Sequence, residues 1–206
     1  MSANCCDHGP EPTASRLVLW IALAINAAMF AVEIVAGVIG GSVSLHADAL
    51  DFLGDSFNYT ISLAVIGMAL TWRARAAMFK GLTMGVLGIW VVGEVVWHIA
   101  FGRVPEPLVM GVIGTLALLA NAAVAILLYR FRTAEANLRS AWICSRNDVL
   151  GNFAVLLAAL GVFGTGTLWP DVVVASAMAA LAIQGSWTVI RQSLIELNGA
   201  ALGAGS

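Results

Sequence analysis

The sequence predicts an all-α membrane protein with six transmembrane helices. Of its 206 residues, 60% are hydrophobic and only 11% are charged, whereas a soluble domain carries about 25% charged residues. The apolar residues gather into six runs, and each run approaches or exceeds the roughly 20 residues that cross the hydrocarbon core of a bilayer. Because lipid offers no partner to a backbone amide, such runs are expected to be helices.

The six predicted spans follow one another along most of the chain, with short polar joints between them. They cover residues 17–39, 43–70, 78–100, 107–129, 140–164 and 171–195. Pro170 fits the first turn of the last span, where a missing backbone N–H costs no helical hydrogen bond. We expect a tail with a Cys/His motif at 1–16, a six-helix membrane domain at 17–195, and a short tail at 196–206 with no soluble domain.

The distribution of basic residues predicts the orientation of the bundle. Eight of them fall on one side, in the tails and in the joints after the second and fourth spans: Arg16, Arg73, Arg75, Lys80, Arg130, Arg132, Arg139 and Arg191. The joints on the other side hold only Arg103. Since cytoplasmic loops carry the excess of Lys and Arg, both termini are expected in the cytoplasm.

Composition also argues against several other classes of protein. The sequence has no basic patch of the kind that binds nucleic acid, so no nucleic-acid partner is expected. The long apolar runs make the lipid bilayer the expected surrounding of the chain. The start, "MSANCCDHGPEPTASR", lacks the positive residues and apolar core of a cleavable signal peptide. The adjacent Cys5 and Cys6 are poorly placed for a structural disulfide.

Polar residues lie on one face of the second span and one face of the fifth. Asp48, Asp51 and Asp55 are spaced i, i+3, i+7, and Asp148 and Asn152 are spaced i, i+4, so each set shares a helical face. Charges inside a span are costly and mark a site or a pathway. A rise of about 1.5 Å per residue is expected to bring Asp51 to the level of Asn152 and Asp55 to that of Asp148. A cation bound between the two helices would neutralise these carboxylates.

The same segments resemble the cation diffusion facilitator family. "GSVSLHADALDFLGDS" (41–56) is similar to the family's second helix, and "DVLGN" (148–152) to its fifth, where His/Asp-x-x-x-Asp pairs supply metal ligands. Asn26 and Glu33 in the first span and "WPD" (169–171) before the sixth agree as well. The resemblance covers all six spans and implies a short member without the family's cytoplasmic C-terminal domain.

The resemblance implies a divalent metal cation efflux transporter that exchanges metal for protons, in a multi-pass fold of a prokaryotic inner membrane. Carried over by position, the ligands are Asp51, Asp55, Asp148 and Asn152. Familiar zinc-type members have at least one histidine in this set. Zinc is the first candidate, but an all-oxygen set is harder and less selective for zinc, so Cd²⁺, Co²⁺, Mn²⁺ and Fe²⁺ stay open. Members are usually dimers, and a homodimer here would use membrane helices.

Further candidate ligands surround this set. They are Asp48, His46 and Cys144 near the two motifs, and Cys5, Cys6 and His8 in the tail. The tail residues offer thiols and an imidazole that capture zinc-like ions, although adjacent ligands alone give an incomplete shell. Glu33 is expected to hold helices together or carry protons, whereas Glu94 and Arg146 have no assigned role.

Three other functions are weighed against transport. A membrane metal-binding sensor would bind the ion without moving it. An intramembrane aspartyl protease needs two facing aspartates, but its Gly-x-Gly-Asp motif is absent, since "FLGD" holds a single glycine. A proton-coupled drug exporter would be expected to have a larger aromatic cavity. No enzymatic activity is expected.

Overall fold

In the computed structural model, residues 12–65, 70–131 and 136–203 are described, and they form six helices. The helices are α1 (Pro12–Gly40), α2 (Val43–Val65), α3 (Leu70–Phe101), α4 (Pro107–Tyr129), α5 (Ala136–Thr165) and α6 (Trp169–Gly203). The predicted all-helical class is therefore confirmed.

Several helices extend beyond their predicted spans. α3 begins at Leu70, so the whole of the predicted joint between residues 70 and 78 is helical, and α6 continues to Gly203. The predicted spans counted only the residues that suit lipid. A helix satisfies its own backbone hydrogen bonds and can continue through polar residues into water.

Five of the six helices in the described residues are long and apolar enough to cross a membrane, and α2 is the exception. α2 has 23 residues but carries Asp48, Asp51 and Asp55, which lower its hydropathy. It is also the helix enclosed by the others, because it packs against α1, α3, α5 and α6. Protein rather than lipid therefore surrounds its polar face.

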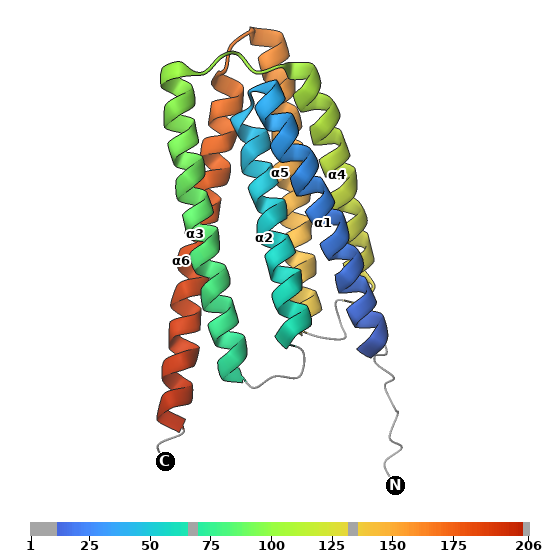
Figure 1. Ribbon diagram of the computed structural model, residues 1–206, viewed down its shortest axis with the longest axis vertical. Helices are drawn as coiled ribbons and strands as arrows, with labels where there is room; N and C mark the ends of the chain where they lie inside the picture. Colours follow the sequence, from blue (N-terminus) through green and yellow to red (C-terminus); the bar gives the residue numbers. More distant parts are fainter. Residues whose placement is uncertain (1–11, 66–69, 132–135, 204–206) are drawn as a thin grey trace.

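Figure 1 shows α1, α2, α4 and α5 side by side as one group, with α3 and α6 paired along its edge. α1 begins and α6 ends at the lower end of this view, where α2 also ends and α3 begins. The turns that join α1 to α2, α3 to α4 and α5 to α6 lie at the upper end. This arrangement puts the described residues of the predicted basic side at one end, whereas Arg132 lies outside the described residues. The side of the membrane that this end faces stays a prediction.

The apolar core lies between the helices, and large apolar side chains also cover the outside. The largest buried cluster joins α2, α3, α4, α5 and α6 around residues such as Val91, Met110 and Val155. On the outer surface Leu108 is 72% exposed and Phe163 is 78% exposed. Such a surface is expected where the surrounding solvent is hydrocarbon.

The turn between α1 and α2 is tied to the start of α6. Gly41 adopts a φ of +62°, which glycine adopts without steric cost. The buried carboxylate of Asp171 then accepts hydrogen bonds from the backbone N–H groups of Val43 (2.8 Å) and Ser44 (3.1 Å) and from the Ser42 hydroxyl (2.7 Å). These N–H groups belong to the first turn of α2 and have no partner within the helix. The "GS" and "WPD" segments thus form one structural unit that fixes α2 in the bundle.

Candidate metal site between α2 and α5

The acidic face of α2 points into the bundle. Asp48 is 1% exposed and Asp55 is 9% exposed, while Asp51 lies between them and interacts electrostatically with both. The helical period placed all three on one face, and packing turns that face toward α1 and α5, where Asp51 is half-buried. On insertion scales a charged aspartate at mid-membrane costs about 2.5–3.5 kcal/mol, so three of them need compensation.

α5 meets this face with its own polar pair. The carboxyl group of Asp148 interacts with that of Asp55. Asn152 is fully buried and donates from Nδ2 to Asp48 Oδ2 at 2.8 Å. The predicted convergence of Asp55 with Asp148 is thus present, whereas Asn152 pairs with Asp48, about one turn away from the expected level of Asp51. The estimate from helical rise assumed equal starting depths for both helices, and packing sets that offset.

Two residues without a role in the sequence interpretation complete the lower part of the site. Tyr59 donates from its hydroxyl to Asp55 Oδ2 at 3.1 Å, and the same hydroxyl lies 2.9 Å from Ser145 Oγ. Tyr59 follows Asp55 by four residues and Ser145 precedes Asp148 by three, so the helical period could have found both. Lys80 of α3 is near enough for its charge to act on Asp55.

The upper part of the site reaches α1 and α4. Glu33 is fully buried and interacts with Asp48 and Asp51. Asn121 of α4 donates from Nδ2 to Asn152 Oδ1 at 2.9 Å. Asn121 lies in a span that is mostly apolar. A lone amide there could have indicated a buried polar contact, although the sequence interpretation did not use it.

The acidic residues form a row rather than a closed ring. Asp48 and Asp55 are seven residues apart, which is about 10 Å along a helix. Within the part of the chain that the structure describes, no three His, Cys, Asp or Glu side chains are drawn together as the shell of a metal ion. The geometry therefore brings Asp51, Asp55 and Asp148 into one interacting row, while their role as ligands stays a prediction.

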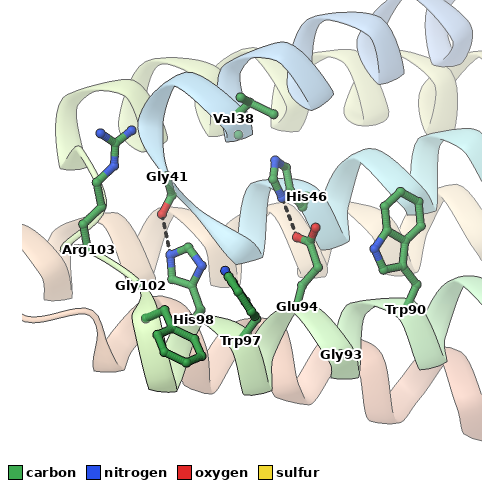
Figure 2. A pocket seen from close by; sticks show the side chains of 12 residues that line it. Val38, Gly41, His46, Trp90, Gly93, Glu94, Trp97, His98, Gly102 and Arg103 are labelled. Atoms are coloured by element: carbon green, nitrogen blue, oxygen red, sulfur yellow. Dashed lines mark hydrogen bonds and ion pairs between the residues drawn. The ribbon is translucent and has the colours of Figure 1, made fainter.

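His46 points away from this row into a separate cavity near the α1–α2 turn. Its Nδ1 lies 2.6 Å from Glu94 Oε2 of α3, and Figure 2 shows the two side chains facing each other. His98 Nε2 lies 2.9 Å from the Gly41 carbonyl oxygen. The cavity has a volume of about 540 Å³ and is also lined by Trp97. Glu94 thus has a partner that the sequence did not reveal.

The side chains of the remaining candidate ligands lie outside what the structure describes. Cys5, Cys6 and His8 lie outside the described residues, and so does the side chain of Cys144, although its backbone belongs to α5. Arg146 is exposed, with its guanidinium 5.5 Å from the centre of the Trp142 ring.

Comparison with known proteins adds a family to this geometry. Residues 19–75 and 72–197 match the cation efflux transmembrane domain. The chain is 27% identical over 204 residues to the zinc transporter ZitB of Escherichia coli K12. The aligned region covers 93% of this chain and 65% of that protein. It is 26% identical over 200 residues to the metal cation efflux system protein CzcD of Cupriavidus metallidurans, covering 91% of this chain and 62% of that protein.

A eukaryotic relative is similar over a shorter stretch. The proton-coupled zinc antiporter SLC30A8 of Xenopus laevis is 28% identical over 186 residues, which cover 74% of this chain and 49% of that protein. The chain thus spans less than two thirds of the length of each of these three relatives.

Proposed function

The chain belongs to the cation efflux family, and on this premise we propose that it exports divalent metal cations, with Zn²⁺ as the first candidate, in exchange for protons. The matched segment is the family's transmembrane domain. ZitB is named a zinc transporter and SLC30A8 a proton-coupled zinc antiporter. The five apolar helices and this family make the chain a multi-pass integral membrane protein, and the bacterial relatives indicate an inner membrane.

The observation that carries the proposal is the row of carboxylates where α2 meets α5, in which Asp55 is buried and Asp51 and Asp148 are half-buried. Asp51, Asp55 and Asp148 interact along one line in the interior. Mutual repulsion and dehydration both disfavour three anions there. A divalent cation offsets both costs. Asn152 adds an amide oxygen that accepts one hydrogen bond from Asn121 and keeps a second lone pair.

The neighbours of the row support a transport cycle. Asp55 lies nearer the end where α1 begins and α6 ends, so a cation from the cytoplasm meets Asp55 and Asp148 first if that end is cytoplasmic. Tyr59 holds the Asp55 carboxylate by its 3.1 Å hydrogen bond. Metal entering the row displaces protons from the carboxyl groups. A rocking motion of the helices in the bundle then opens the row to the outside, where protons displace the metal.

The donor set bears on selectivity. Three carboxylates and an amide are oxygen ligands, which suit harder ions better than histidine or thiolate sites do. We therefore expect Mn²⁺, Fe²⁺ and Co²⁺ to compete with Zn²⁺, and the softer Cd²⁺ to compete less well. A homodimer formed through membrane helices and a cytoplasmic location of both termini also belong to this proposal.

Ion flux into proteoliposomes under an imposed proton gradient tests the proposal. The test variant is Asp51→Asn with Asp148→Asn, which removes two charges at nearly constant shape. The matched control is Glu106→Gln, because Glu106 is an exposed carboxylate between α3 and α4. We expect the metal flux of the control to equal that of the parent. The flux of the double variant is expected to be at least about tenfold lower than that of the parent.

The other outcomes separate the rival functions. Equal flux in the parent and the double variant would refute the carboxylate row as the transport site. Metal binding without flux of any ion would favour the sensor. Absence of binding, together with metal-independent cleavage of a helical substrate, would favour the protease.

A further inference from the structure

A second group of buried polar atoms lies next to the carboxylate row, on the side of α1. Glu33 is 0% exposed, and among the described residues its carboxyl oxygens meet no hydrogen-bonding group other than the carboxyl group of Asp48. The Asp48 carboxylate interacts with it from α2. Nearly all buried polar atoms in proteins have a partner, so a buried carboxylate without a donor requires an explanation such as an ion.

The group extends from Asp48 through α5 to α4. Asn152 donates to Asp48 and accepts from Asn121, by hydrogen bonds of 2.8 and 2.9 Å. Asn121 is 2% exposed, and its Oδ1 also has no donor among the described residues. The chain of four side chains therefore presents acceptor oxygens without donors at both of its ends. A bound cation would satisfy acceptor oxygens that have no hydrogen-bond donor.

We propose that Glu33 and Asp48 bind a second cation between α1 and α2, of the hard, oxygen-preferring class of Mn²⁺ and Mg²⁺. The two carboxylates supply the charge that a divalent ion requires, and the neighbouring amides carry no charge that would oppose it. Carboxylate and carbonyl oxygens suit Mg²⁺, Ca²⁺ and Mn²⁺. Asn152 is a positioning residue, because its Nδ2 fixes one oxygen of Asp48.

This position adjoins the site proposed for transport, because Glu33 also interacts with Asp51 and Asn152 contacts Asp48, but one ion cannot be held by Asp48 and Asp55 together. Asp48 and Asp55 lie about 10 Å apart along α2, which exceeds the span of one coordination shell with metal–oxygen distances of about 2.0–2.6 Å. Its existence does not depend on metal export. The nearest imidazole on α2, that of His46, takes no part, because it pairs with Glu94.

Titration of the purified full chain with Mn²⁺ alone tests the proposal. Electron paramagnetic resonance of free Mn²⁺ gives the number of bound ions. The starting protein carries Asp55→Asn and Asp148→Asn, which disable the first site at residues remote from Glu33. We expect this protein to bind one Mn²⁺, and added Glu33→Gln to weaken that binding at least about tenfold. Added Glu106→Gln, on the exposed surface, is expected to leave it unchanged.

Two results would overturn the second site. One is that the protein with Asp55→Asn and Asp148→Asn binds no Mn²⁺, a result that is obtained without any change at Glu33. The other is that Glu33→Gln, folded as judged by an unchanged melting temperature, binds Mn²⁺ as tightly as its background. Glu33→Asp keeps the charge on a shorter side chain, so its affinity is expected to fall between those of the background and Glu33→Gln.

Discussion

Replacement of Asp171 by alanine is expected to destabilise the protein strongly, although residue 171 lies outside the candidate metal site. The Asp171 carboxylate accepts hydrogen bonds from the N–H groups of Val43 and Ser44 and from the hydroxyls of Ser42 and Ser44. The hydroxyls can turn to other acceptors, but the two backbone donors cannot. All of these groups are buried.

The magnitude follows from the two donors left without an acceptor. A buried polar group that loses its partner costs about 1–3 kcal/mol, so the two donors together are expected to lower the free energy of unfolding of Asp171→Ala by about 2–6 kcal/mol. Asp171→Asn keeps one acceptor oxygen and should cost about half as much. Glu106→Ala is the matched control, because Glu106 caps α4 without any side-chain hydrogen bond. It is expected to change stability by less than about 0.5 kcal/mol.

The assay is equilibrium unfolding in mixed micelles, monitored by tryptophan fluorescence. A loss below about 1 kcal/mol for Asp171→Ala would refute the reasoning, because it would mean that water or another group replaces the carboxylate at little cost. A loss equal to that of the Glu106 control would show that the cap contributes nothing specific.

Two further predictions concern single contacts. Tyr59→Phe removes the hydrogen bond to Asp55, so zinc affinity measured by calorimetry is expected to fall about tenfold, and an unchanged affinity would contradict this role. A Cβ at Gly37 would collide with the ring of His46, whereas a Cβ at Gly93 meets nothing within 4 Å. Gly37→Ala should therefore cost about 1–3 kcal/mol in the same unfolding assay and Gly93→Ala should not destabilise, while equal stabilities would argue against this packing.

The sequence predicted the features that depend on helical period and composition. The common face of Asp48, Asp51 and Asp55 follows from their spacing, and the structure turns that face into the bundle. The enclosure of α2 could also be anticipated, because a helix with three aspartates is a poor neighbour for lipid.

Features that depend on how two helices slide and rotate against each other were not predictable in the same way. The pairing of Asn152 with Asp48 rather than with Asp51 reflects the axial offset of α5 relative to α2, which no local pattern encodes. The contact between His46 and Glu94 likewise requires α2 and α3 to meet at that level. The extra turns of α3 before residue 78 were missed because hydropathy marks the edge of lipid rather than the end of a helix.

X-ray absorption at the zinc edge, on the full chain loaded with one equivalent of Zn²⁺, tests most directly whether Asp51, Asp55 and Asp148 hold the ion. The account predicts a first shell of oxygen at about 2.0–2.2 Å that changes when Asp51→Asn and Asp148→Asn are introduced. A shell containing sulfur at about 2.3 Å, or a spectrum identical in parent and variant, would contradict the carboxylate site.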